Sequence, residues 1–285
     1  MFGDKEFLND NQYNAYRISG IAHLLAVSGL HVGIITSILY FILDRIRFKG
    51  WKRLFLVSAF LFVYAYICGF AVSVVRAMIM AIVLMLSKIF KEDYDTLSSI
   101  SIAGIIIFLF NPLCVFDIGF QMSFACVFGI ALFSTPIKNA LMSIKFPEQV
   151  ATAFAISLST MIALMIIMAY YFKTLNIISL IANILLIPIF TIGFSIVFVI
   201  SMLSFIPNIC VVLYPVNYIF DFINVVAIAL GSLPFANMRT IGIHFLGIIV
   251  YFVILFILSS ICLAKPLNKA IISISLLAIL VLLLV

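Results

Sequence analysis

An apolar run near the N-terminus, HLLAVSGLHVGIITS, contains the residues of this sequence that come nearest to chemistry. Ser28 and His31 stand three positions apart, so on a helix the hydroxyl could hydrogen-bond to the imidazole, as nucleophile and base do in a hydrolase. His23 and His31 would lie about 80° apart on such a helix, which lets both face one cavity but does not match the i, i+4 spacing of a zinc-binding helix. Alternatively, the histidines bond to neighbouring backbone, while Ser28 and Gly29 permit close helix packing.

Arg76 is the basic residue inside the apolar run GFAVSVVRAMIMAI. A guanidinium within a membrane helix is costly and usually faces a cavity, a carboxylate or an anionic substrate. Asp117 and Asp221 are candidate partners because they lie in or next to other apolar runs. The sequence leaves two interpretations open: a polar vestibule that contains Arg76, or an Arg76–Asp117 ion pair that only holds helices together.

A third polar cluster lies in the run NPLCVFDIGFQMSF and contributes Asp117, Gln121 and Ser123. Asp117, Gln121 and Phe124 are spaced at i, i+4 and i+7, so they share one face of a helix. We expect this face to point into the interior of a helix bundle.

The sequence gives little support for metal, cofactor or nucleotide chemistry. The sequence has neither a CxxC pair nor a GxxxxGK[ST] loop, so it predicts no metal site, no cofactor and no ATP hydrolysis by that route. The five cysteines are scattered: Cys68, Cys114, Cys126, Cys210 and Cys262. We therefore predict that the chain has no catalytic residues and is not an enzyme, with a hydrolase built on Ser28 and His31 as the alternative.

The composition predicts which kind of secondary structure positions these residues. Hydrophobic residues make up 66% of the 285 residues and charged residues 9%, and the mean hydropathy is +1.37. A soluble domain of this length cannot hide so much apolar surface from water. Several charge-free stretches meet or exceed the roughly 20 residues that a membrane-spanning helix needs. The predicted fold class is all-α, a polytopic transmembrane helical bundle with about nine or ten spans.

We predict a polar or amphipathic segment at the outer face over residues 1–20 and a transmembrane domain over 21–285. In the span 177–205, Asn183 and Pro188 predict either a packing kink or a broken helix that lines a cavity. The predicted helices lie near 21–43, 54–69, 72–90, 96–110, 115–134, 150–170, 177–205, 209–231, 241–264 and 270–285.

We attribute the net charge of +6 to the orientation of the chain in the membrane. With the N-terminus outside, most of the 16 basic residues fall in loops on the cytoplasmic side, as the positive-inside rule requires. In that orientation His23, Arg76 and Asp117 lie toward the outer ends of their helices, which predicts a water-filled outer vestibule. The predicted cytoplasmic set is Arg45, Arg47, Lys49, Lys52, Arg53, Lys88, Lys91, Lys138, Lys145, Lys265 and Lys269.

The run from Gly20 to Val32, GIAHLLAVSGLHV, resembles the signature of the competence domain of the ComEC family, the inner-membrane channel for DNA uptake in bacterial transformation. Gly3-Asp4-Lys5 precedes it as the short polar approach that the family has there. Further matches follow in the family's order, and the resemblance covers essentially the whole chain. They are Gly69, Ser73, Arg76, Ala77, Pro112, Asp117, Gly119, Phe120, Gln121, Ser123 and Phe124.

This resemblance implies that the chain carries one strand of DNA across a bacterial plasma membrane while the other strand is degraded outside. The family's oligonucleotide-binding and nuclease modules are not found in the sequence, so we expect an isolated channel domain. A separate nuclease, a DNA receptor and an ATP-driven motor are the implied partners, and the strand passes through one protomer or between two copies of a homodimer. The residues expected at the path are His23, Ser28, His31, Arg76, Asp117, Gln121 and Ser123.

One alternative from a different class is a secondary transporter for a small anionic solute, with Arg76 and a broken 177–205 helix as its site. It predicts inverted internal repeats, whereas the polar clusters occur once each in the first half of the chain.

Overall fold

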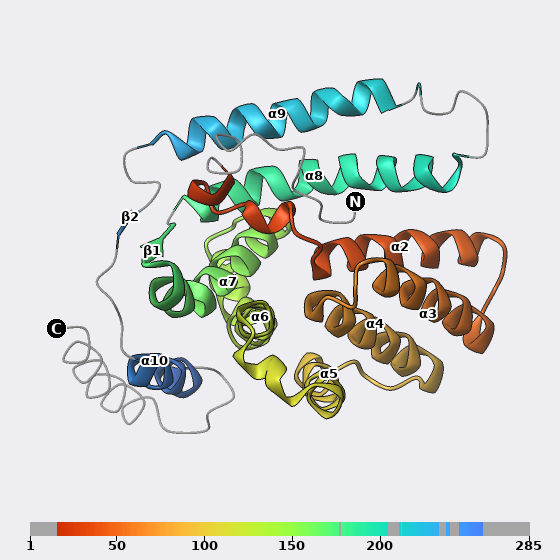
Figure 1. The fold of residues 1–285 in the computed structure, drawn as a ribbon, viewed down its shortest axis with the longest axis horizontal. Helices are drawn as coiled ribbons and strands as arrows, with labels where there is room; N and C mark the ends of the chain where they lie inside the picture. Colours follow the sequence, from red (N-terminus) through yellow and green to blue (C-terminus); the bar gives the residue numbers. More distant parts are fainter. Residues whose placement is uncertain are drawn as a thin grey trace. The chain divides into compact units, whose positions relative to one another are not determined.

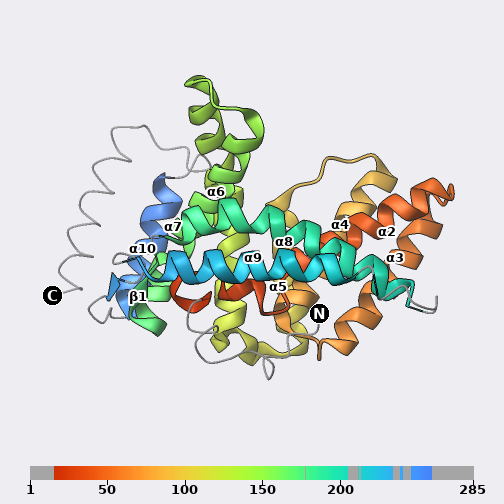
Figure 2. The same cartoon turned by 90° about the horizontal axis from the view of Figure 1, so that it is seen from above.

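The computed structural model describes residues 16–176, 178–204, 211, 213–233, 238–239 and 245–258. They form two compact units, with the divisions of the chain between Phe120 and Gln121, between Leu180 and Ile181, and between Leu233 and Pro234. Figure 1 shows the elements of both units along the chain, and Figure 2 gives a second view.

The first unit contains two short 3-10 helices, η1 (Ala22–Leu24) and η2 (Pro112–Phe116), and most of its α-helices. The three helices α2, α3 and α4 pack against one another, while α8 and α9 run side by side (Figures 1 and 2). The α-helices of this unit are α2 (Gly29–Arg45), α3 (Gly50–Ile67), α4 (Val72–Phe90), α5 (Thr96–Phe110), nearly all of α8 (Ser179–Met202) and α9 (Tyr214–Gly231).

One apolar core joins five helices of the first unit. It is built from side chains of α2, α3, α4, α8 and α9, with Ile35, Leu61, Val74, Leu186 and Ile223 each at most 1% exposed. These five helices come from two separate parts of the chain, 29–90 and 179–231, so the core fixes the loop before α2 against segments far away in sequence. That loop carries Ser28.

The second unit contains most of α6 (Ile118–Ser143), α7 (Glu148–Phe172) and α10 (Phe245–Leu258), together with a pair of two-residue antiparallel strands, β1 (Thr174–Leu175) and β2 (Met238–Arg239). Its helices approach closely at Gly129, where a Cβ atom would lie 2.5 Å from the Cβ of Ala163 and 2.8 Å from the carbonyl oxygen of Ser159. The Tyr251 hydroxyl of α10 donates to the Ile162 carbonyl of α7 over 2.7 Å.

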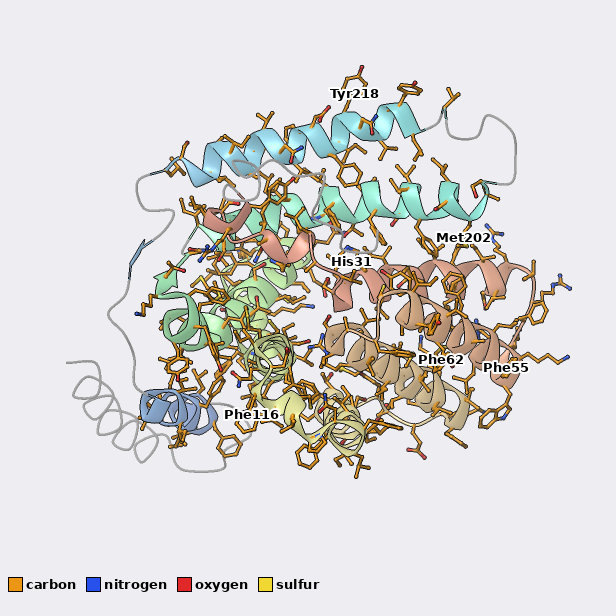
Figure 3. All side chains as sticks on the ribbon, viewed as in Figure 1. His31, Phe55, Phe62, Phe116, Met202 and Tyr218 are labelled. Atoms are coloured by element: carbon orange, nitrogen blue, oxygen red, sulfur yellow. The ribbon has the colours of Figure 1, made fainter. Side chains whose placement is uncertain are left out.

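The predicted all-α multi-span architecture is confirmed. Among the described residues, six helices are long and apolar enough to cross a membrane: α3, α4, α6, α7, α8 and α9. Large apolar side chains cover their outer surfaces, since Phe55, Phe62 and Tyr218 are more than half exposed (Figure 3). Such surfaces are stable only in contact with lipid or another protein. The predicted span 270–285 and most of the predicted segment 1–20 lie outside the described residues.

The structure corrects three sequence-based expectations. The predicted first span, 21–43, is divided into η1 and α2 by a non-helical stretch, so His23 and His31 do not share a helix. Of the two interpretations of Asn183 and Pro188, the broken helix does not form, because α8 continues from Ser179 to Met202 with Pro188 inside it. The span expected to end near residue 134 continues past Pro136 to Ser143. Prolines are tolerated inside membrane helices because neighbouring groups satisfy the freed carbonyl.

Candidate functional site

The candidate site is the start of α2, where the chain leaves η1 and enters the helix. Ser28 has an extended backbone and occupies the N-cap position, and Gly29 is the first helical residue. The first amides of a helix have no intrahelical acceptor, and they carry the positive end of the helix dipole. This end of α2 carries Ser28 and His31, two of the polar residues in the apolar run near the N-terminus.

His31 completes the cap of α2. The backbone N–H of Ser28 donates to His31 Nδ1 over 3.2 Å, and the Ser28 hydroxyl lies 3.0 Å from the same nitrogen. Because Nδ1 accepts the backbone N–H, the proton of the neutral ring is on Nε2. The predicted contact between the Ser28 hydroxyl and His31 is therefore present, and the same ring nitrogen also accepts a hydrogen bond from the backbone of the helix cap.

The His31 ring is buried against α8. It is 4% exposed, and it meets the rings of Phe190 and Phe194 edge-on, with centroids 5.4 and 4.7 Å away. Figure 3 shows His31 on the side of α2 that faces α8. The two phenylalanines are one helical turn apart and nearly parallel to each other. This contact holds α2 and α8 together at the level of the cap.

Arg76 comes to the same place from α4. It is 6% exposed, and its Nη2 atom lies 2.9 Å from the position that a Cβ atom on Gly29 would occupy. The Ser73 hydroxyl, one turn earlier on α4, donates to the Val27 carbonyl over 2.9 Å, which ties α4 to the loop before α2. A guanidinium is thus held against the positive end of α2.

This arrangement is electrostatically unusual. A cation near a helix N-terminus is repelled by the dipole, whereas an anion placed there is attracted by both the dipole and the cation. Gly29 has no side chain that could separate the guanidinium from the first turn of α2. The electrostatics at the start of α2 beside Arg76 therefore favour an anion, such as a phosphate or carboxylate group, over a second cation.

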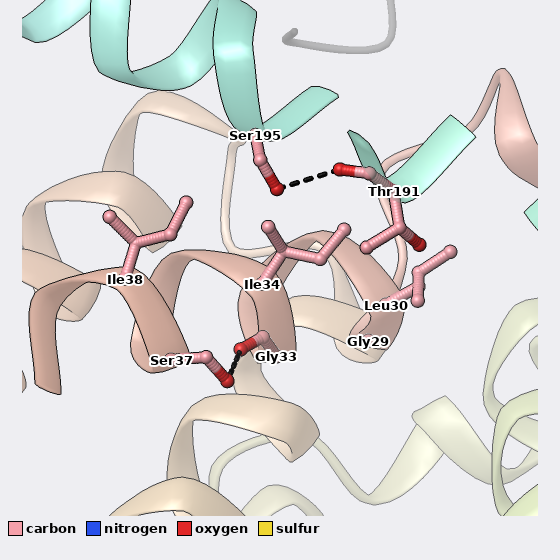
Figure 4. A pocket seen from close by; sticks show the side chains of 8 residues that line it. All are labelled: Gly29, Leu30, Gly33, Ile34, Ser37, Ile38, Thr191 and Ser195. Atoms are coloured by element: carbon pink, nitrogen blue, oxygen red, sulfur yellow. Dashed lines mark hydrogen bonds between the residues drawn. The ribbon is translucent and has the colours of Figure 1, made fainter. Parts of the chain in front are cut away.

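An open groove of about 450 Å³ begins at the same glycine and runs between α2 and α8 (Figure 4). Its hydroxyl groups are satisfied by their own helices: Ser37 donates to Gly33, Thr191 to Ile187 and Ser195 to Thr191, over 2.6 to 2.8 Å. The groove therefore presents a largely apolar wall. The lining residues are Gly29, Leu30, Gly33, Ile34, Ser37, Ile38, Thr191 and Ser195.

The other predicted site residues lie elsewhere. His23 is exposed in η1, where its Nδ1 is 3.2 Å from the Gly20 carbonyl. Asp117 is exposed and caps α6, with its carboxylate accepting the N–H of Phe120 over 2.8 Å. The predicted helical face shared by Asp117 and Gln121 does not form, because α6 begins at Ile118. Asp117 thus serves its own helix.

Gln121 and Ser123 are half-buried on the part of α6 that belongs to the second unit. Asn183 lies on α8, and its buried side-chain oxygen has no hydrogen-bond partner among the described residues. Such an acceptor is uncommon in a folded interior and marks a polar point on an otherwise apolar helix. The role of Gln121 and Ser123 in a DNA path stays a prediction.

Sequence reasoning missed four residues of the site. Phe190 and Phe194, like Thr191 and Ser195, repeat at i, i+4 on α8, and this spacing was visible in the sequence as two adjacent stripes. The stripe alone gave no sign that it packs against α2. Within the described residues no group of three metal-ligating side chains comes together.

Comparison with known proteins gives a family assignment. The family model described as "Competence protein" matches residues 1–266. ComE operon protein 3 of Bacillus subtilis is 34% identical over 189 residues, which are 66% of this chain and 24% of that protein. Recombination protein 2 of Haemophilus influenzae is 25% identical over 67% of this chain and 26% of its own length.

An uncharacterized protein of Mycoplasma genitalium, MG316, is 29% identical over 48% of this chain and 35% of its own length. The chain thus spans between about a quarter and a third of the length of these curated relatives. No solved structure matches it. The family model covers nearly the whole sequence, including every residue of the candidate site, and the chain belongs to the competence protein family.

Proposed function

We propose that this chain forms part of a membrane conduit that carries a single strand of DNA into a bacterial cell during natural transformation. Membership of the competence protein family and the six apolar helices support this role. We place the protein in the plasma membrane with its N-terminus outside, on the distribution of its basic residues. In that orientation the start of α2 lies toward the outer face.

The observation that carries the proposal is the position of Arg76 against the start of α2. A polyanion that crosses hydrocarbon needs favourable groups for its phosphates, because an unpaired charge in lipid is very costly. The guanidinium, whose Nη2 lies 2.9 Å from the Cβ position of Gly29, and the first amides of α2 supply two such groups close together. They would receive one backbone phosphate at a time.

Sparse charge suits transport. Many phosphate contacts would bind the strand tightly and stop its movement, since each neutralised phosphate adds to affinity. Conduction requires binding that is weak enough to release the cargo. Arg76 is the basic residue on α4 before the last turn of that helix, and the nearby groove has a largely apolar wall. A phosphate could therefore leave this point as readily as it arrives.

In this proposal the chain binds and guides the strand, and other proteins do the remaining work. A nuclease and a DNA receptor would deliver a single strand on the outer side, and an ATP-driven motor or trapping of the strand inside would supply the work. Two copies of the chain would form the conduit if one protomer is too narrow.

The test is genetic complementation in a transformation-defective strain. Transformants and internalised labelled DNA would be counted with the wild-type gene, with Arg76→Ala and with Arg76→Lys. We expect the alanine variant to fall to the level of the empty vector and the lysine variant to keep part of the activity, because lysine preserves charge but not the planar donor geometry.

Membrane-inserted protein would be measured by immunoblot in the same cells. Normal transformation with Arg76→Ala would remove Arg76 from the mechanism. Loss of both protein and uptake would assign Arg76 to folding, and the lysine variant would then decide whether charge alone restores the protein.

One observation favours a second candidate, an intramembrane hydrolase, because the Ser28 hydroxyl lies 3.0 Å from His31 Nδ1. However, the same nitrogen also accepts the Ser28 backbone N–H, and no carboxylate among the described residues is hydrogen-bonded to His31 to orient it. Covalent labelling of Ser28 by a fluorophosphonate probe, abolished in Ser28→Ala, would support this candidate. The secondary-transporter alternative required a broken helix in the span 177–205, and α8 is continuous from Ser179 to Met202.

A further inference from the structure

A second charged feature lies at the opposite end of α2, where α2, α3 and α4 meet. Six basic side chains are exposed there, at the end of α2, in the turn between α2 and α3, in the first turn of α3 and at the end of α4. We call this set the basic rim, and its members are Arg45, Arg47, Lys49, Lys52, Lys88 and Lys91.

Contacts between the three helices hold the rim in place. Tyr40 of α2 has the guanidinium of Arg53 3.9 Å from its ring centroid and the Lys88 ammonium 4.6 Å from it. Arg53 is also paired with Asp44 over 2.8 Å. Among the described residues no carboxylate is paired with Lys88 or with the other rim residues.

Helix dipoles explain only half of this charge. Arg45, Lys88 and Lys91 lie at the C-terminal ends of α2 and α4, where a cation is favourable. Lys49 and Lys52 are the N-cap and a first-turn residue of α3, where the dipole repels a cation, and this turn contains no acidic residue. Their position therefore favours an anion from outside the chain.

Aromatic side chains next to the rim indicate what carries that anion. Trp51 and Phe90 meet edge-on with centroids 5.8 Å apart, and they are 59% and 61% exposed. Phe55, one turn further along α3, is 73% exposed and points away from the unit (Figure 3). On a helix that crosses a membrane, such residues are covered by acyl chains, so the cations one turn away lie at the depth of the headgroups.

We propose that the basic rim binds an anionic phospholipid, with the headgroup phosphate on Lys49, Lys52 and Lys88 and an acyl chain against Trp51 and Phe90. A lipid carries both the charge and the apolar chain that this surface needs, whereas a DNA strand carries the charge without the chain. This inference does not depend on the proposed transport of DNA.

Trp51 makes a direct test available, because the chain contains one tryptophan. The full chain would be reconstituted into bilayers that contain either brominated phosphatidylglycerol or brominated phosphatidylcholine at equal mole fractions. Bromine on an acyl chain quenches tryptophan fluorescence on contact. We expect stronger quenching by the anionic lipid, and a roughly tenfold or greater preference for it over the zwitterionic lipid.

The variant Lys49→Gln/Lys52→Gln should lose most of this preference. The control Lys145→Gln/Lys173→Gln removes the same charge from exposed positions of the second unit, and it should keep the preference. Circular dichroism of both variants in phosphatidylcholine checks that they fold.

Equal quenching by the two lipids in the wild type would overturn the proposal. So would an equal loss of preference in both double variants, because net charge would then be the cause. Binding of a single-stranded oligonucleotide that depends on Lys49 and Lys52, without any lipid preference, would assign the rim to nucleic acid instead.

Discussion

The guanidinium of Arg76 occupies the space beside Gly29 that any side chain on this glycine would need, with Nη2 2.9 Å from the Cβ position. The glycine and the arginine belong to different helices and are 47 positions apart in the sequence. Their contact places a buried cation on the first turn of α2.

Gly29 is therefore expected to be sensitive to size. The methyl group of Gly29→Ala would meet the end of a flexible arginine, so the guanidinium would shift at a small cost in stability. We expect reduced DNA uptake with normal amounts of membrane-inserted protein, measured by transformation and immunoblot in the same cells.

Gly33 provides the matched control. It lies one turn further along α2, and no atom is within 4 Å of its Cβ position. Gly33→Ala should leave uptake unchanged and should stabilise the helix by up to about 1 kcal/mol, since alanine is a better helix former. Equal effects of the two substitutions would mean that the Arg76 contact is irrelevant.

Ser28 is expected to act through the cap of α2. Replacing it with alanine removes the hydroxyl and should lower the free energy of unfolding by about 1 kcal/mol, whereas glycine should cost only a few tenths. Thermal unfolding in detergent measures both. The cap interpretation predicts that uptake follows the amount of folded protein, while a hydrolase would lose all activity with either variant.

Packing between α6 and α7 predicts a strong effect at Gly129. A methyl group there would lie 2.8 Å from a backbone carbonyl oxygen, which cannot move without displacing its helix. We expect Gly129→Ala to destabilise the protein by about 1–3 kcal/mol and to lower its amount in the membrane.

Gly193→Ala is a suitable comparison for Gly129→Ala, because its nearest neighbours are side-chain atoms of Ile219 and Phe220 at 3.2 and 3.4 Å. Side chains can adjust by a few tenths of an ångström, so the effect should be smaller. Limited proteolysis of the two variants would rank them, and a more labile Gly193→Ala would contradict the packing argument.

Asp95 predicts a pH effect outside the spans. The Ser98 hydroxyl and the N–H groups of Ser98 and Leu97 hydrogen-bond to its carboxylate and hold its pKa below the usual value. A lowered pKa in the folded state means that the stabilisation is complete at neutral pH and is lost as the pH falls through that value. The difference in melting temperature between wild type and Asp95→Ala should therefore begin to shrink as the pH falls below about 4, where a free aspartate titrates, and should go on shrinking until the folded carboxyl is protonated as well.

The hydropathy pattern and the helix-breaking residues predicted the helix ends well where a polar capping residue follows or precedes the span. The predicted ranges 72–90 and 96–110 agree with α4 and α5, since Lys91 ends one helix in the left-handed region and Asp95 caps the next. The first span was wrong because Ser28 and His31 start a helix by capping, and an apolar run does not reveal where a cap interrupts it.

The site could be predicted only as a set of residue types. Ser28 and His31 are neighbours in sequence, so their hydrogen bond followed from spacing. The approach of Arg76 to Gly29, and of Phe190 and Phe194 to His31, depends on tertiary packing between helices that are distant in the chain. A single sequence contains no signal for such contacts.

Pro188 removes one backbone hydrogen-bond donor from α8. Because proline has no backbone N–H, the carbonyl of Ile184 lacks its usual intrahelical hydrogen-bond partner. A helix bends most easily where such a hydrogen bond is missing. Phe190 and Phe194 lie in the turns that follow Pro188. A bend of α8 at this point would move both rings relative to His31, so the missing hydrogen bond and the start of α2 are connected through these two ring contacts.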